Sequence, residues 1–118
     1  MKKVNIIIPT KDRLKLLERA VDSVINQTYK NWELFIINDS KNELNFKNSD
    51  SRISVLPNFN KSGANGARNT GIEKSRGYYI AFLDDDDTWH PDKLLKQVEI
   101  METSNAIMCY TGRNIIFK

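Results

Sequence analysis

Four adjacent aspartates, Asp84 to Asp87, follow the apolar run "YYIAFL" and precede Pro91. Neighbouring carboxylates repel one another, most strongly where water is excluded, so such a cluster calls for a compensating charge. Mg²⁺ takes oxygen ligands and typically binds one or two protein carboxylates together with substrate phosphates. A cation held here could clamp a diphosphate and stabilise it as a leaving group. The competing interpretation is an exposed helix cap, because carboxylates are favoured before a helix N-terminus.

Hydrophobic runs predict the strands that must position these aspartates. Short runs rich in β-branched residues predict buried strands at Val4–Ile8, Glu33–Asp39, Ile53–Leu56 and Tyr78–Leu83, and further strands in "AIMCYTG" and "NIIF". Because Pro9 lacks an N–H group, we expect it to end the first strand.

Helical spacing of apolar residues predicts three helices between the strands. The first lies in "TKDRLKLLERAVDSVINQ", with Thr10 or Asp12 as its cap. The second lies in "SGANGARNTGIEKSRG" and should end with Gly77 at the C′ position. Its predicted face of small residues consists of Ala64, Ala67, Arg68, Gly71, Ile72 and Ser75. The third should carry Pro91 in its first turn and run to about Glu102. Trp32 and Trp89 are expected to be packing residues.

This order of elements predicts one α/β domain over residues 1–118, a Rossmann-like and mostly parallel sheet flanked by helices. In such sheets ligands bind beyond the carboxyl ends of the strands, where the strand order reverses. With a strand order of 3-2-1-4, the reversal lies between the first and fourth strands. The strand ends then deliver four polar segments to one edge: Pro9–Arg13, Asn38–Ser40, Asn58–Ser62 and Asp84–Asp87.

The first strand-to-helix turn, "PTKDRL", contains no glycine, and the chain has no GxxxxGK[ST] segment. A glycine-rich loop that cradles phosphate through backbone amides is therefore excluded, and another group must neutralise a bound phosphate. Taken alone, Arg13 and Arg68 would be surface charges and Asp39 a turn residue. The hypothesis of a diphosphate site rests on their shared position at one sheet edge.

Composition narrows the functional classes. The 118 residues are 40% hydrophobic and 28% charged, with a net charge of +3 and no long basic block, which disfavours nucleic-acid binding. The single cysteine, Cys109, excludes an internal disulfide. No apolar run approaches the roughly 18 residues of a membrane span, so we expect a cytoplasmic domain.

Four segments resemble, in order, the N-terminal half of the family 2 glycosyltransferases, which have the GT-A fold. They are "IIIPTKDR", "LERAVDSVINQTYKNWELFIINDS", "NKSGANGARNTG" and "GYYIAFLDDDDTWHPDKL", the last containing the family's Asp-x-Asp motif. The resemblance covers nearly residues 3 to 102 and extends to spore-coat polysaccharide transferases. The resemblance implies that the protein transfers a sugar from a UDP-sugar to a saccharide or lipid-linked glycan. It also implies that the reaction inverts the configuration of the sugar.

The resemblance also implies roles for individual residues. Asp39 would accept a hydrogen bond from the base, the turn Thr10 to Arg13 would line base and ribose, and Arg68 would lie along the nucleotide. Asp84 and Asp85 would approach the ribose or a metal-bound water, and Asp86 would ligate Mg²⁺ or Mn²⁺. The implied nucleotide-binding set is thus Pro9, Thr10, Lys11, Arg13, Asp39, Arg68, Asp84 and Asp85, with Asp86 as the metal ligand and no role assigned to Asp87.

Two departures from the family pattern are visible. Lys11-Asp12 replaces the usual Tyr-Asn, which removes an aromatic that could stack on the base, and Asn38-Asp39 replaces Asp-Asp. The acceptor-binding half and the general base of this family lie beyond the matched region, so no catalytic residue is assigned. We expect the chain, apparently truncated before that half, to bind nucleotide weakly and to transfer little sugar by itself.

Two alternatives stay open. One is a non-catalytic nucleotide-binding or oligomerisation module of the same fold, and the other is a metal-dependent nucleotidyl or phosphoryl transferase. The open edges of an unfinished sheet would favour a homo-oligomer. A lipid-linked acceptor would place the protein peripherally at the inner face of the membrane.

Overall fold

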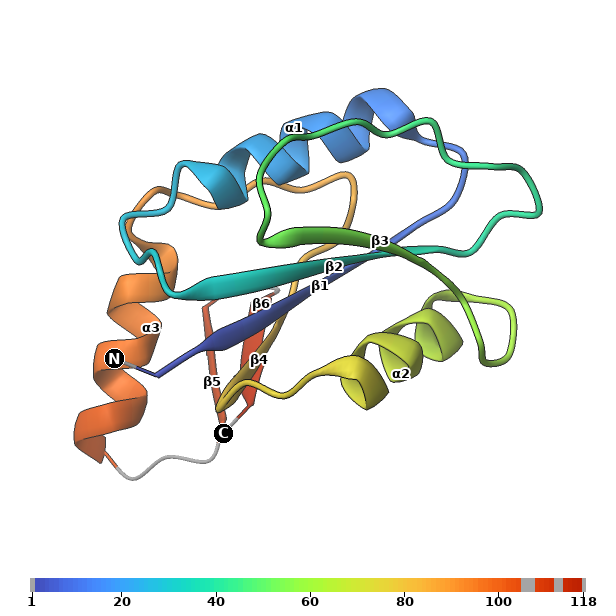
Figure 1. Cartoon of the computed structure of the whole chain (residues 1–118). Helices are drawn as coiled ribbons and strands as arrows, with labels where there is room; N and C mark the ends of the chain where they lie inside the picture. Colours follow the sequence, from blue (N-terminus) through green and yellow to red (C-terminus); the bar gives the residue numbers. More distant parts are fainter. Residues whose placement is uncertain (1, 105–107, 112–113, 118) are drawn as a thin grey trace.

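The computed structural model describes residues 2–104, 108–111 and 114–117 (Figure 1). Its elements in chain order are β1 (Val4–Thr10), α1 (Leu14–Ile25), β2 (Trp32–Asn38), β3 (Ile53–Pro57), α2 (Ala64–Lys74), β4 (Tyr79–Phe82), α3 (Lys93–Ser104), β5 (Met108–Thr111) and β6 (Asn114–Phe117). The predicted strand positions Ala106, Ile107 and Gly112 lie outside the described residues. No helix in the described ranges is long and apolar enough to cross a membrane.

The described strands form one sheet in the order β3-β2-β1-β4-β6-β5. β1 pairs in parallel with β2 and with β4, and β2 pairs in parallel with β3. This is the order 3-2-1-4 that we assumed to locate the site edge, and it confirms the predicted α/β fold class. β6 extends the sheet antiparallel to β4, and β5 is antiparallel to β6.

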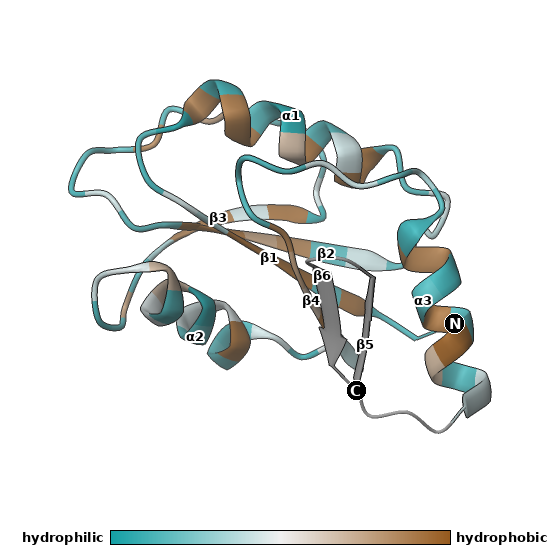
Figure 2. Ribbon diagram, turned by 180° about the vertical axis from the view of Figure 1, so that it is seen from behind, coloured by the Kyte–Doolittle hydropathy of each residue, from teal (hydrophilic) through white to brown (hydrophobic). Residues whose placement is uncertain are grey.

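Helices cover the sheet on both faces (Figure 1). α1 and α3 pack on one face, where Ile6, Leu17 and Leu94 are fully buried in the larger hydrophobic cluster. α2 packs on the other face against a smaller cluster that contains Ile7 and Ala67. Figure 2 shows the resulting pattern: β1 is largely hydrophobic along its length, whereas α1 alternates between hydrophobic and hydrophilic residues. Trp32 and Trp89 are buried in the larger cluster, as predicted.

The first strand does not end at Pro9, as we expected, but continues to Thr10. Pro9 pairs with Ile37 of β2, while pairing with β4 ends at Ile7 and Phe82. Neighbouring residues of a parallel strand direct their hydrogen-bonding groups to opposite sides, and Thr10 uses its carbonyl toward β2 by accepting from the Asp39 N–H. The backbone nitrogen of Pro9 therefore points toward the side where β4 no longer pairs with β1. Its missing N–H costs the sheet no hydrogen bond.

The predicted caps of α1 are wrong. Arg13 occupies the N-cap position, and no side chain caps the helix there. The Thr10 hydroxyl instead donates to Asp85, and Asp12 accepts hydrogen bonds from the segment after β2. The capping side chains that local sequence rules selected are thus engaged in long-range contacts that those rules cannot include.

Two other helix ends also differ from the prediction. α3 begins at Lys93, and Pro91 lies in the preceding turn, where its carbonyl accepts from the Thr28 N–H at 2.9 Å. α2 ends at Lys74 with an extended Ser75, so Gly77 is not its C′ residue. Gly77 is required for close approach instead, because a Cβ there would lie 2.6 Å from Oδ1 of Asn5.

Candidate nucleotide site

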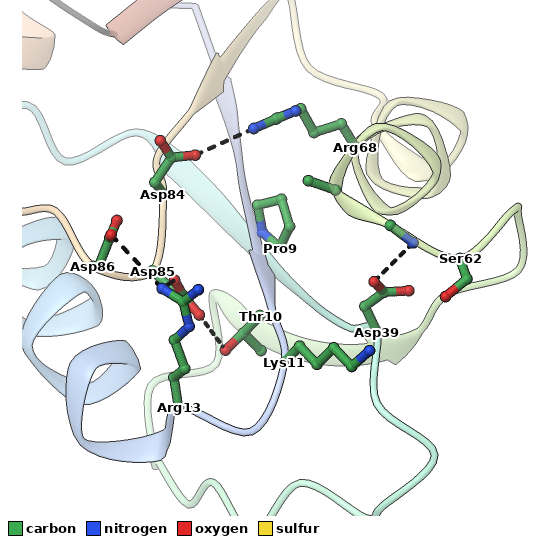
Figure 3. A pocket seen from close by; sticks show the side chains of 12 residues that line it. Pro9, Thr10, Lys11, Arg13, Asp39, Ser62, Arg68, Asp84, Asp85 and Asp86 are labelled. Carbon is green, nitrogen blue, oxygen red and sulfur yellow. Dashed lines mark hydrogen bonds and ion pairs between the residues drawn. The ribbon is translucent and has the colours of Figure 1, made fainter.

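A pocket of about 470 Å³ opens at the carboxyl edge of the parallel strands (Figure 3). It is lined by Pro9, Thr10, Lys11, Arg13, Asp39, Ser62, Gly63, Ala64, Arg68, Asp84, Asp85 and Asp86. The structure therefore brings every nucleotide or metal candidate named from the sequence to one cavity. Asp87, which received no role, is not among the lining residues.

The pocket exists because β1 and β4 separate at this edge. Their last hydrogen bond joins the Leu83 N–H to the Ile7 carbonyl at 3.1 Å. Beyond it, β1 turns toward α1 and β4 continues into the acidic segment Asp84–Asp87, here called the acidic loop. This is the point where the strand order reverses, the usual position of a ligand in an open α/β sheet.

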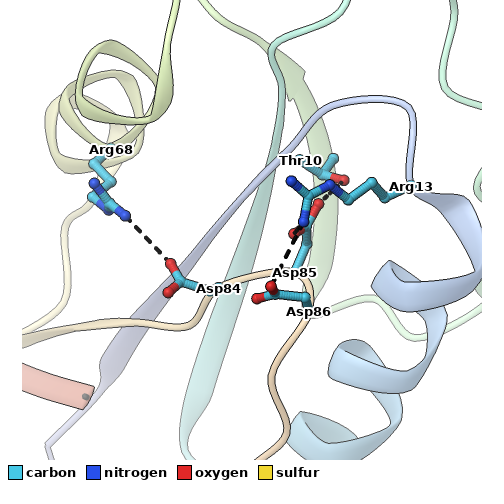
Figure 4. Close-up of polar contacts among 6 residues, drawn as sticks. All are labelled: Thr10, Arg13, Arg68, Asp84, Asp85 and Asp86. Carbon is cyan, nitrogen blue, oxygen red and sulfur yellow. Dashed lines mark hydrogen bonds and ion pairs between the residues drawn. The ribbon is translucent and has the colours of Figure 1, made fainter.

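The members of the acidic loop have different partners (Figure 4). Asp85 is only 7% exposed, and its carboxylate accepts a 2.9 Å hydrogen bond from the Thr10 hydroxyl. Nη1 of Arg13 lies 3.4 Å from the Asp85 carboxylate and 3.7 Å from that of Asp86. From the opposite face of the sheet, Nη2 of Arg68 lies 3.3 Å from Asp84. Two arginines that follow different strands thus offset the mutual repulsion of the aspartates.

The acidic loop is not a helix cap. α3 begins at Lys93, well beyond Asp87, and its first turn contains no acidic residue. The loop instead closes on itself, because the Asp87 N–H donates to the Asp84 carbonyl at 3.1 Å. This geometry rules out the competing interpretation of the cluster and leaves its carboxylates at the pocket.

Asp39 forms the other end of the pocket. Its carboxylate accepts from the Gly63 N–H at 2.9 Å and from the Asn58 amide at 2.8 Å. Gly63 has a φ of 115°, which side-chain-bearing residues rarely adopt. A Cβ on Gly66 would lie 1.7 Å from the Lys61 carbonyl, so glycine is also needed where the loop folds back on α2.

Sequence reasoning did not assign Ser62, Gly63 or Ala64 to the site, although it placed Ser62 at the correct edge. The available signal was the glycine spacing in "SGANGA", which we interpreted as the start of a helix. That interpretation is correct for α2, but the same glycines also allow the backbone to reach Asp39.

The turn after β1 is fixed by Asp12. Its φ of 54° is unusual for a residue other than glycine, and its carboxylate accepts from the Ser40 hydroxyl at 2.7 Å and the Asn42 amide at 3.4 Å. The hydrogen bond from Ser40, followed by that from Asn42, lowers the pKa of the Asp12 carboxyl. These contacts join the turn to the segment after β2 and leave Lys11 extended toward Asp39 (Figure 3).

The residues at this edge are compatible with a divalent cation that binds through one carboxylate. In the described part of the chain, no three His, Cys, Asp or Glu side chains are grouped to hold a metal ion. The Asp86 side chain is 55% exposed at the pocket, and Nη1 of Arg13 lies 3.7 Å from its carboxylate. Because Mg²⁺ commonly completes its coordination with substrate phosphates and water, one carboxylate in this position is compatible with a shared protein–substrate site.

The Glycosyl transferase family 2 model matches residues 5–118. The chain is 41% identical over 117 residues to the Escherichia coli protein named UDP-Glc:alpha-D-GlcNAc-diphosphoundecaprenol beta-1,3-glucosyltransferase WfgD, covering 96% of this chain and 46% of the relative. It is 34% identical over 119 residues to the putative teichuronic acid biosynthesis glycosyltransferase TuaG of Bacillus subtilis, covering 96% of this chain and 47% of the relative. The chain spans less than half the length of these curated relatives.

Solved glycosyltransferase structures share the fold. The mannosyltransferase PcManGT of Pyrobaculum calidifontis, solved with GDP-Man and Mn²⁺, aligns with a TM-score of 0.79 at 16% identity over 99% of this chain and 44% of its own. TarS 1-349 of S. aureus with UDP aligns with a TM-score of 0.75 at 17% identity over 90% of this chain and 34% of its own. The fold is therefore GT-A, and the family match over nearly the whole length, together with the named relatives, shows that this chain belongs to glycosyl transferase family 2.

Proposed function

We propose that this chain is the donor-binding part of a glycosyltransferase and binds a UDP-sugar in the pocket between Asp39 and the acidic loop. The observation that supports this proposal is that the two ends of one cavity present different chemical groups. Asp39 offers hydrogen-bond acceptors at one end, and three aspartates with two arginines line the other. A nucleoside diphosphate has the matching polarity, with a hydrogen-bonding base at one end and a doubly charged group at the other.

At the base end, we assign Asp39 to the uracil N–H. The Gly63 N–H and Asn58 amide hold its carboxylate in place. The turn Thr10 to Arg13, fixed through Asp12, lines base and ribose, with Pro9 beneath it. Lys11 takes the place of the family's aromatic and contributes a cation with a flexible apolar stem.

At the diphosphate end, Asp86 would hold Mg²⁺ or Mn²⁺, and an ion bound there would supply positive charge that stabilises the diphosphate as a leaving group. Arg68 lies along the nucleotide, and Asp84 faces the ribose or a metal-bound water. Asp85 already accepts from Thr10 and Arg13, so it acts mainly by holding those two residues around the nucleotide.

The acceptor is a saccharide carried on a lipid diphosphate, and the reaction inverts the sugar. The support for this acceptor is the name of relatives such as WfgD, which specifies a sugar linked to diphosphoundecaprenol. Such an acceptor places the reaction at the inner face of the membrane. The general base is not assigned to any residue of this chain.

A panel of nucleotides tests the donor assignment. In the presence of Mn²⁺, we expect UDP to bind at least about tenfold more tightly than ADP or CDP, because only uracil and guanine offer an N–H beside a carbonyl to Asp39. Asp39→Asn should remove most of this preference. Asp22→Asn, which makes the same change at an exposed position of α1 outside the pocket lining, is the control. Equal binding of UDP, ADP and CDP would contradict the assignment.

A further inference from the structure

Gln27 is a buried amide that joins α1 to the segment before α3. It is 0% exposed and lies two residues after the end of α1. Its amide nitrogen donates to the carbonyls of Ser23 at 3.0 Å and His90 at 2.7 Å. Its amide oxygen accepts from the Leu94 N–H at 3.0 Å. Both kinds of hydrogen-bonding group on this side chain are therefore used, and two of the three bonds cross to the chain that follows the acidic loop.

Thr28 reinforces the same connection. Its N–H donates to the Pro91 carbonyl at 2.9 Å, and its hydroxyl donates to the Asp92 carboxylate at 3.0 Å. Figure 1 shows the end of α1 beside the start of α3, which these bonds join. Between this anchor and the loop, Trp89 is 5% exposed and packs in the larger hydrophobic cluster.

The acidic loop is thus fixed at both ends. On the sheet side, Leu83 bonds to Ile7 and Asp85 accepts from Thr10. On the far side, Gln27 holds His90, which lies four positions after Asp86. The Asp86 side chain is itself 55% exposed, so its position depends on these two anchors more than on its own packing.

We propose that Gln27 is a positioning residue for the metal-dependent step of nucleotide binding: through His90 it sets where the acidic loop presents Asp86. This proposal rests on the proposed donor site. Gln27 does not line the pocket, and neither do its hydrogen-bond partners Ser23, His90 and Leu94, so its influence is indirect. Removing its amide leaves the Leu94 N–H without its acceptor and leaves the His90 carbonyl with only the Lys93 N–H as a donor, which favours a shift of the backbone between His90 and Leu94.

Asn5 provides a matched control at the opposite end of β1. It is also 0% exposed; its oxygen accepts from the N–H groups of Arg76 and Gly77, and its nitrogen donates to Glu33 at 3.1 Å. Gln27→Met and Asn5→Leu each replace a fully buried, triply bonded amide by an apolar side chain of similar size. Both should lower the melting temperature, but only Gln27→Met should alter the acidic loop.

Two measurements on the whole chain, made below both melting temperatures, separate the roles. Hydrogen exchange should accelerate at residues 84–92 in Gln27→Met and at residues 76–79 in Asn5→Leu. By calorimetry, the factor by which Mn²⁺ strengthens UDP binding should fall about tenfold in Gln27→Met and stay unchanged in Asn5→Leu. Gln27→Glu, which keeps the acceptor but as a carboxylate cannot donate to His90, should change both readouts in the same direction and serves if Gln27→Met does not fold.

Unchanged exchange at residues 84–87, or an equal loss of the Mn²⁺ factor in Gln27→Met and Asn5→Leu, would overturn the positioning role. Faster exchange at residues 84–92 in a protein whose UDP binding never depends on Mn²⁺ would instead support the anchoring of the loop and contradict the proposed donor site. The two failures are therefore distinguishable.

Discussion

The aspartates of the acidic loop are neighbours in sequence but occupy different environments. Asp85 is nearly buried and has Thr10 and Arg13 as partners, whereas the side chains of Asp84 and Asp86 are 51% and 55% exposed. The sequence predicts the cluster and its edge of the sheet, but four identical letters do not reveal which carboxylate is held and which faces a ligand. That difference arises from partners that are distant in sequence. Thr10 and Arg13 lie more than 70 positions from Asp85, and Arg68 lies 16 positions from Asp84.

Thr10→Val tests the hydrogen bond to Asp85 at the residue scale. Valine keeps the shape of Thr10, which is 3% exposed, but leaves a nearly buried carboxylate without this donor. We expect the free energy of unfolding to fall by about 1–3 kcal/mol, measured by urea denaturation. Thr88→Val, at an exposed position just after the acidic loop, is the control and should change the free energy of unfolding by less than about 0.5 kcal/mol. Equal effects of both variants would contradict the assigned role of the Thr10 hydroxyl.

At the scale of elements, α2 can lie close to the sheet because its inner residues are small. Gly66, Ala67, Thr70 and Gly71 are its buried positions. The sequence predicted a face of small residues and included Ala67 and Gly71, but it also included Ala64 and Ile72, which are exposed. Helical periodicity alone could not fix the rotation of a helix with so few large apolar residues.

Gly71→Ala tests this close packing. A Cβ at Gly71 would lie 2.6 Å from the nearest side-chain carbon of Ile7. Although alanine favours helices by about 1 kcal/mol over glycine, we expect a net loss of about 1–2 kcal/mol in the free energy of unfolding, because α2 must move from β1. Asn69→Ala, at an exposed position of the same helix, should be neutral or slightly stabilising. Thermal and urea denaturation of both variants measure this, and a more stable Gly71→Ala protein would show that the helix has room to adjust.

The helix ends show where prediction from local rules failed. Thr10, Asp12 and Gly77 have residue types suited to caps, but the folded chain uses them for contacts between segments distant in sequence. Those contacts form only when the sheet order is established. The elements themselves were predictable because their burial patterns are periodic, whereas their ends depend on the assembled fold.

At the scale of the whole molecule, the order β3-β2-β1-β4 is the one that the sequence analysis assumed, and it agrees with right-handed crossovers between parallel strands. The site edge followed from that order. The specific partners of Asp39, among them the Gly63 N–H, could not be predicted, because they depend on how the loop after β3 folds back on α2. The antiparallel addition of β6 and β5 also has no signature in the periodicity of their short segments.

The acid dependence of stability offers a test of one surface contact. Hydrogen bonds from the Arg52 side chain and backbone hold the pKa of the Asp50 carboxyl at about 2, below its usual 3.8, while Arg52 stacks 3.7 Å over Trp32. A lowered carboxyl pKa contributes stability above pH 3.8, and this contribution disappears as the pH falls toward 2. Because solvent screens the pair, we expect Asp50→Asn to cost only about 0.5–1 kcal/mol at pH 7.

Urea denaturation of the unchanged chain and Asp50→Asn between pH 7 and pH 2 measures this contribution. The two proteins should converge in stability as the pH falls below about 3.8. A difference that persists unchanged to pH 2 would show that Asp50 acts through its shape and not through its charge.

The most direct test of the central claim is calorimetric titration of UDP with and without Mn²⁺. We expect Mn²⁺ to strengthen UDP binding at least about tenfold in the unchanged chain, because Asp86 would hold the ion and the ion would supply positive charge for the diphosphate. Asp86→Asn should abolish this gain, while Asp87→Asn, which alters a neighbouring carboxylate outside the pocket lining, should preserve it. UDP binding that is equally tight with and without Mn²⁺, or a gain that survives in Asp86→Asn, would contradict the account.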